Sequence, residues 1–266
     1  MHNGAIMPSE VRHVVDTDAI YPVVRLTGML DAQSAPTVRS ALLDVLAQQP
    51  EAVVIDVSDL RLADPSAAAV MRDVVRETAD WPAAHLALCN RDGASRWHST
   101  GLPVWTSRAD AFAELGEPDA RQQLSLELEP VVGAARRSRE LVTEACARWE
   151  RPGLAGPACI VVTEMVNNVV AHAHTPMIVL LALHGDTMTA AVRDRSANVP
   201  RLTEPVSPTA YGGRGLLLID SMAERWGSLG LDDGKVVWAV LADEPDEPAA
   251  DRKDLNSAGM PDPARG

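Results

Sequence analysis

The most constraining feature of the chain is an apolar helix pattern at residues 161–173 that carries one polar stripe. Apolar residues recur there every three or four positions, which is the spacing of one buried face of an α-helix. Glu164, Asn168 and His172 lie at i, i+4 and i+8, so these polar side chains share another face. The amide oxygen of Asn168 can ligate Mg²⁺, and Glu164 can orient or deprotonate a nucleophile beside a phosphate. Taken alone, the segment favours a solvated stripe on an amphipathic helix.

A strand pattern follows at residues 187–194, where side chains alternate in polarity and Asp194 continues the apolar side. A carboxylate on an apolar face is costly unless hydrogen-bond donors meet it. The exocyclic amine of adenine is one such donor. The competing interpretation is an Asx-turn, in which the Asp194 carboxylate caps the backbone amides of Arg195 and Ser196. The strand alone leaves both interpretations open.

A third stretch places three glycines, Gly212, Gly213 and Gly215, directly before a predicted helix at residues 216–222. Glycine lets the backbone approach an anion closely, and a helix start presents free N–H groups with the positive end of the helix dipole. Such a loop is often only a flexible turn, but its position at a helix start favours phosphate binding. Arg214 can contact a phosphate or point to solvent, and the sequence does not choose between these.

These stretches occur in the order E-x-x-x-N-x-x-x-H, D-x-S and G-x-G-L, which resembles the N, G1 and G2 boxes of the histidine-kinase-like ATPase fold. Within that superfamily the chain most resembles the anti-sigma factor serine kinases. The segments GRGLLLIDSMAERWG (213–227) and GKVVWAVL (234–241) are similar to actinobacterial members of that group. The resemblance covers about residues 122–243 and implies an α/β sandwich.

The same resemblance implies a role for each box residue. Glu164 is the expected catalytic base, and Asn168 is the expected Mg²⁺ ligand. Ser196 stands where the wider superfamily usually has glycine, although serine is familiar in the anti-sigma branch. The cofactors implied are ATP and Mg²⁺. The expected cofactor-binding residues are Asn168, Asp194 (on adenine), Ser196, Gly213 and Gly215 (on the phosphates), and Arg214.

The first half of the chain alternates between valine-rich strand signals and helical periodicity, which predicts a small sheet covered by helices. The pattern resembles the STAS domain of anti-sigma factor antagonists over about residues 10–117. The segments that carry this resemblance are LTGMLDAQSAPTVRSAL (26–42), VVIDVSDLRLADPSAAAVM (53–71) and SRADAFAEL (107–115). The expected fold class is therefore α/β (α+β), a STAS-like domain followed by the ATPase domain.

One loop departs from the STAS pattern. Members of that family normally carry Asp-Ser-Ser/Thr-Gly there, and the first serine accepts phosphate. This chain has Asp64-Pro65-Ser66-Ala67, so a proline without a hydroxyl occupies the acceptor position. Pro65 suits the first turn of a helix, and the pattern favours a structural role for Ser66 inside that turn. We expect that this domain has lost phospho-switching and serves as a fixed docking or regulatory module.

Charge and composition narrow the class of partner. The net charge of −13 argues against binding duplex nucleic acid, and it suits a basic protein partner. The first residues lack a secretory signal pattern, and no window reaches the length of a membrane span, so we expect a cytoplasmic protein that binds neither nucleic acid nor membrane. Residues 244–266 are rich in Pro, Asp and Glu, which predicts a disordered acidic tail.

The leading functional prediction is an ATP-binding anti-sigma regulatory factor in partner switching. Its serine-kinase activity would act on a separate STAS-type antagonist, and its partners would be that antagonist, a sigma factor, or both. The alternative is a catalytically silent ATP-binding or docking module that sequesters a sigma factor under control of the fused STAS domain. A homodimer through the ATPase domain is possible. A sensor histidine kinase fragment is disfavoured because no helical hairpin with a phosphoacceptor histidine precedes the ATPase region.

Overall fold

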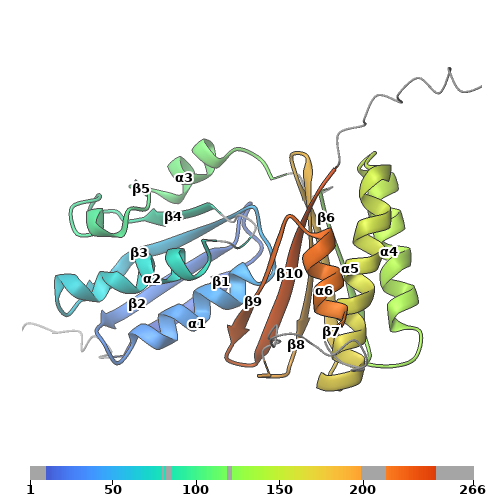
Figure 1. Cartoon of the computed structure of the whole chain (residues 1–266). Coiled ribbons are helices and arrows are strands. Elements are labelled where there is room, and N and C mark those ends of the chain that lie inside the picture. The colour runs from blue at the N-terminus through green and yellow to red at the C-terminus, as the bar shows by residue number, and fades with distance from the viewer. Residues whose placement is uncertain (1–9, 80, 82–84, 119–121, 199–213, 244–266) are drawn as a thin grey trace, which may run out of the picture.

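Two five-stranded sheets, each with its own helices, make up the computed structural model of the chain (Figure 1). The structure describes residues 10–79, 81, 85–118, 122–198 and 214–243. The predictions for Gly213 and for the tail at 244–266 lie outside these residues, as does the side chain of Arg214. We call the first sheet with its helices the N-terminal unit, and the second sheet with its helices the C-terminal unit.

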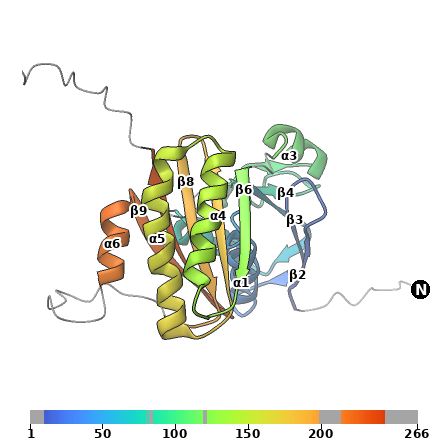
Figure 2. The same ribbon diagram turned by 90° about the vertical axis from the view of Figure 1, so that its right-hand side faces the viewer.

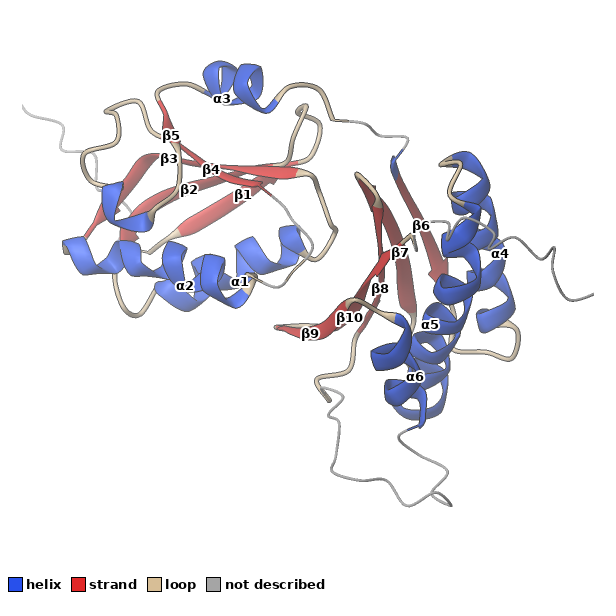
Figure 3. Cartoon of the chain, turned by 45° about the horizontal axis from the view of Figure 1, so that its top comes forward, coloured by secondary structure: helices blue, strands red, loops and turns tan. Residues whose placement is uncertain are grey.

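The N-terminal unit has strand order β1-β2-β3-β4-β5, with β1 antiparallel to β2 and the remaining pairs parallel. The helices α1 and α2 cover one face of this sheet, and α3 packs on the other (Figure 3). The strands are β1 (Arg12–Asp16), β2 (Val23–Leu30), β3 (Ala52–Leu62), β4 (His85–Cys89) and β5 (Val104–Trp105). The helices are α1 (Ala35–Leu46), α2 (Ala69–Glu77) and α3 (Arg108–Leu115).

The turn before α2 forms as the sequence predicts. Pro65–Ala68 is a short 3₁₀ helix with proline in its first turn, and Asp64 is its N-cap. The Asp64 Oδ1 atom accepts a hydrogen bond from the Ser66 backbone N–H at 2.8 Å and another from the Ser66 hydroxyl. Ser66 therefore sits inside a capped turn, as its structural interpretation expects.

The C-terminal unit has strand order β6-β7-β8-β10-β9, and every pair is antiparallel. Three helices cover one face of this sheet (Figure 2). The strands are β6 (Gln123–Leu128), β7 (Met177–His184), β8 (Thr187–Asp194), β9 (Arg225–Leu231) and β10 (Gly234–Ala242). The helices are α4 (Ala134–Arg148), α5 (Ala155–Asn168) and α6 (Arg214–Met222).

Both faces of the second sheet are buried. Along β10, Val237, Ala239 and Leu241 pack under the helices α4–α6, because alternate residues of a strand point to opposite faces. The residues between them, Val236, Trp238 and Val240, belong to the core of the N-terminal unit. A strand that is apolar on both faces is the pattern expected when layers cover both sides of a sheet.

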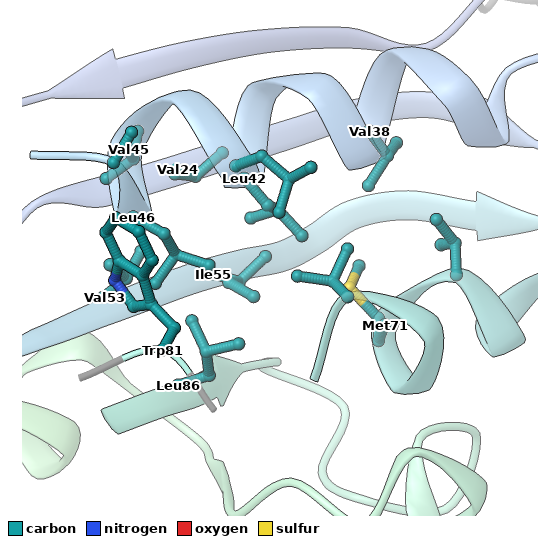
Figure 4. Packing of buried hydrophobic residues seen from close by; sticks show 14 of the residues in the cluster. Val24, Val38, Leu42, Val45, Leu46, Val53, Ile55, Met71, Trp81 and Leu86 are labelled. Carbon is teal, nitrogen blue, oxygen red and sulfur yellow. The ribbon is translucent and has the colours of Figure 1, made fainter. Parts of the chain in front are cut away.

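The N-terminal unit provides the second cover. Trp81, which follows α2, meets Trp238 edge to face with ring centroids 5.9 Å apart and an interplanar angle of 76°. Trp81 belongs to the same hydrophobic cluster as the residues of α1 and β3 drawn in Figure 4. The two units therefore share one continuous apolar core.

Polar contacts surround this shared core. The Arg193 Nη2 atom lies 3.2 Å from Asp44 Oδ1 of α1 and 3.0 Å from Asp233 Oδ1 of the β9–β10 turn. The Ser40 hydroxyl of α1 donates to Asp232 Oδ2 of the same turn at 2.6 Å. Helix α1 thus contacts the turn that leads into β10.

One sequence expectation needs correction. Within the described residues, the continuous helix Pro152–Ala173 is long and apolar enough to cross a membrane by length and composition, with a mean hydropathy of 1.4. The expectation that no window reaches this length is therefore wrong. Val161, Val162 and Val166 of this helix are fully buried in the core beneath the second sheet, and 39% of its apolar window is buried.

Candidate functional site

The candidate site is built around Asp194 at the end of β8, which is 3% exposed. It lies on the helix-covered face of the sheet, with Met177 of β7 and Lys235 of β10 as its cross-strand neighbours. Asp194 Oδ1 accepts a hydrogen bond from the Ser196 backbone N–H at 2.7 Å and one from Lys235 Nζ at 2.9 Å. Lys235 Nζ also donates to the Ser196 carbonyl oxygen at 3.3 Å.

This geometry tests one of the two interpretations that the strand left open, and the Arg195 amide takes no part in it, because it donates to Thr175 Oγ1 at 3.1 Å. The Asx-turn is present, because the carboxylate caps the Ser196 amide. It uses Oδ1, whereas Oδ2 receives no hydrogen bond from any residue that the structure describes. Among the residues that the structure describes, none thus competes with a ligand donor for Oδ2. Lys235 was not predicted as a site residue, although a lysine inside the otherwise apolar strand β10 is a signal that points to it.

Gly234 allows β10 to approach Asp194. A Cβ atom at this position would lie 2.0 Å from the Asp194 carbonyl oxygen and 2.7 Å from the Arg195 Cα atom. Both contacts are with backbone, so neither can be relieved by rotating a side chain. Glycine is therefore required for the register that sets Lys235 opposite Asp194.

Replacing Gly234 with alanine is expected to lower the free energy of unfolding by about 1–3 kcal/mol, because the backbone must move to admit the methyl group. Urea denaturation measures this loss. Gly230→Ala is the matched control, since Gly230 is the cross-strand neighbour of Lys235 on β9 and an added Cβ there meets nothing within 4 Å. Equal losses in the two variants would contradict the close approach.

Of the three polar residues of the predicted stripe, Glu164 and Asn168 belong to the C-terminal part of α5, and both are half-buried. Glu164 faces the start of α6: a Cβ atom added at Gly215 would lie 2.6 Å from Glu164 Oε2. Asn168 is the last residue of α5, where the chain passes into a π-helical turn at Val169–Ala173. Because that turn bonds i to i+5, the exposed His172 departs from the stripe's α-helical spacing.

The predicted residues therefore meet in two pairs. Glu164 contacts Gly215 across the α5–α6 junction, and Asp194 contacts Ser196 at the end of β8. Helix α5 packs on the face of β8 that carries Asp194. Among the described residues, no group of three or more His, Cys, Asp or Glu side chains forms a metal site on its own. A Mg²⁺ ion at Asn168 would therefore depend on phosphate oxygens for other ligands.

A cavity of about 760 Å³ lies beside this site. Its lining includes Asp194, Arg195 and Met177, together with residues at the start of α4. Neither Glu164 nor Asn168 lines it. The cavity therefore lies on the β6–α4 side of Asp194, away from the pair formed by α5 and α6.

Two family models match the chain. Residues 13–80 match "Mlab, STAS domain", and residues 128–241 match "Histidine kinase-like ATPase domain". The first match ends just after α2, and the second runs from the end of β6 almost to the end of β10.

Two solved structures are similar to parts of the chain. One is an anti-sigma factor antagonist from Mycobacterium paratuberculosis, with 25% identity over 41% of this chain and 96% of that one, and a TM-score of 0.34. The other contains the RsbU and RsbW domains of a Mycobacterium tuberculosis protein, with 19% identity and a TM-score of 0.35. That match covers 45% of this chain and only 31% of the other. A search of curated proteins returned no match.

Proposed function

We propose, from the premise that this chain joins an N-terminal STAS domain to a histidine-kinase-like ATPase domain, that the protein is an ATP-binding anti-sigma regulator in partner switching. The observation that carries the proposal is the buried carboxylate of Asp194. No described residue donates a hydrogen bond to its Oδ2 atom, which can therefore accept one from a ligand. A cytoplasmic location and a homodimer through the ATPase domain belong to the same proposal.

The described residues fit a bound nucleotide. Asp194 Oδ2 can accept a hydrogen bond from the exocyclic amine of adenine. Gly215 has no side chain, so the start of α6 comes close to Glu164. A Cβ atom at this position would collide with the Glu164 carboxylate. Such a side-chain-free helix start suits phosphate oxygens. Asn168 lies on the same helix as Glu164, one turn later, and can supply an amide oxygen to Mg²⁺.

The finer proposal is serine-kinase activity toward a separate STAS-type antagonist. ATP with Mg²⁺ would supply the phosphoryl group and neutralise its charge. The chain's own contribution would be to position the reactants and to accept a proton. Glu164 is half-buried at the α5–α6 junction. The role proposed for its carboxylate is to accept the proton of an incoming serine hydroxyl.

The arrangement of the two domains supports an acceptor on another protein. The STAS domain packs on the sheet face opposite the helices α4–α6, while Glu164 and Asn168 belong to that helical layer. The Ser66 turn lies at the start of α2, whereas Trp81, which contacts the sheet, follows the end of α2. Ser66 therefore lies at the far end of α2 from this contact, and its hydroxyl is bonded to Asp64.

Incubation with labelled Mg-ATP and STAS proteins that carry an Asp-Ser-Ser-Gly loop tests this activity. We expect Glu164→Gln to slow phosphotransfer by roughly 10²–10⁴-fold, because a general base contributes about that much. Asn168→Ala should abolish transfer by removing the Mg²⁺ ligand. Ser66→Ala is the matched control and should transfer phosphate to the antagonist at the wild-type rate. Label on Ser66 itself would contradict the proposed structural role of that residue.

A second candidate function is a binding module that holds ATP and sequesters a sigma factor without phosphorylating anything. The observation that favours it is the proline at the usual acceptor position, in a STAS domain that already covers one face of the ATPase sheet. The same assay separates the two candidates. Partner binding that survives Asn168→Ala while phosphotransfer disappears supports the kinase, and wild-type protein that never labels any STAS acceptor supports the binding module.

A further inference from the structure

The Lys235 ammonium group contacts Asp194, the residue proposed to bind the nucleobase, and has no part in the function described so far. Its side chain is 8% exposed, and that of its partner Asp194 is 1% exposed. The Nζ–Oδ1 distance is 2.9 Å. Burying both charges costs several kcal/mol of desolvation per ion, and an apolar pair of similar volume is often as stable. Stability alone is therefore a weak explanation for this pair.

The arrangement of the strands places both charged groups on the same side. Lys235 and Asp194 are directly opposed in the β8–β10 ladder, so their side chains point to the same face. That face is the one covered by α5, as the packing of Val192 and Val237 beneath the helices shows. The ammonium group thus belongs to the same layer as Asn168, the last residue of α5.

Each member of the pair keeps part of its hydrogen-bonding capacity. An ammonium group has three N–H donors, and Lys235 uses two of them, on Asp194 Oδ1 and on the Ser196 carbonyl. Asp194 uses Oδ1 for two donors. Within the part of the chain that the structure describes, the third N–H and Oδ2 have no partner. The pair therefore offers one donor next to one acceptor.

We infer that Lys235 is a nucleobase-recognition residue, and this inference rests on the proposed nucleotide site. A 6-aminopurine presents the complementary pattern, because its amino group is a donor flanked by ring nitrogens that accept. Asp194 Oδ2 accepts from the 6-amino group, and Lys235 donates to an adjacent ring nitrogen, N1 or N7. The hydrogen bond from Lys235 is charge-assisted and is stronger than one between neutral groups.

Competition binding with nucleotide analogues tests the ring-nitrogen contact without changing the protein. The probes are ATP, 1-deaza-ATP and 7-deaza-ATP, each titrated against the full-length chain. We expect one of the two deaza analogues to bind about 10- to 100-fold more weakly than ATP, because it lacks the acceptor for Lys235. The analogue that is penalised identifies the edge of the base that Lys235 contacts.

The variant Lys235→Met then assigns the penalty to this side chain. In the variant, ATP and the penalised analogue should bind within about threefold of each other. Arg148→Met is the control for the lost charge, since Arg148 is an exposed residue of α4 that pairs with Glu144. This control should keep the full penalty.

Three outcomes overturn the inference. Equal binding of all three nucleotides by the wild type removes the ring-nitrogen contact but leaves the nucleotide site in place. A penalty of the same size in Lys235→Met and wild type assigns it to another residue. Wild-type protein that binds none of the nucleotides removes the proposed site itself, and the inference with it. Where Lys235→Met fails to fold, equal binding of the three nucleotides by the wild type still overturns the inference.

Discussion

Replacing Trp238 with alanine is expected to lower the free energy of unfolding by about 3–5 kcal/mol, the usual cost of truncating a buried tryptophan. The Trp238 side chain lies between the domains: Trp81 meets it edge to face, and Gly227 lies against its ring on the adjacent strand. A Cβ atom added at Gly227 would lie 2.8 Å from the Trp238 Cζ2 atom. Urea denaturation followed by circular dichroism measures the loss.

Trp105→Ala is the control for this prediction. Trp105 belongs to β5, in the small cluster around α3 on the other face of the STAS sheet, and is only half-buried. We expect a smaller loss there. A double-mutant cycle of Trp81→Ala with Trp238→Ala should give a coupling of about 0.5–1.5 kcal/mol. Zero coupling, or separate unfolding transitions for the two domains in the wild type, would refute the shared core.

The sequence predicted the helix layer and the strand geometry because those patterns are local. Alternation along 187–194 placed Asp194 on the apolar side of its strand, and β8 has that arrangement. The spacing of Glu164 and Asn168 predicted a common helix, and α5 carries both. Each inference needed only the period of one element.

The interdomain packing was harder to predict because it depends on pairing between distant segments. The sequence did contain a signal: residues 236–241 are apolar without alternation, which indicates a strand covered on both faces. It gave no indication of which layer supplies the second cover. That layer is the STAS domain, through α1 and Trp81.

The ion pair at the site illustrates the same limit. Lys235 lies 41 residues after Asp194, and only the register of β8 with β10 brings the two side chains together. The π-helical turn after Asn168 could not be predicted from the sequence either, because its residues continue the apolar periodicity of the helix before it. Local patterns therefore predicted the elements that carry Asp194, Glu164 and Asn168, but they did not predict that Lys235 pairs with Asp194.

Replacing Asp194 with asparagine is expected to weaken ATP binding at least 100-fold. The asparagine amide can still accept one hydrogen bond, but its NH₂ group would then face the amino group of adenine, donor against donor. The variant also leaves Lys235 buried without its counter-charge, and breaking a buried pair in this way typically costs about 3–5 kcal/mol of stability. Calorimetric titration with Mg-ATP and urea denaturation measure the two effects separately.

The double variant Asp194→Asn with Lys235→Met separates the role in binding from the role in folding. Removing both charges eliminates the unpaired cation, so most of the lost stability should return. ATP binding should remain at least 100-fold weaker than in the wild type, because the acceptor for the adenine amine is still missing. Asp233→Asn is the matched control, since Asp233 is exposed in the β9–β10 turn and pairs with Arg193 on the opposite face. If ATP binding recovers together with stability in the double variant, Asp194 acts on the nucleotide only through the fold.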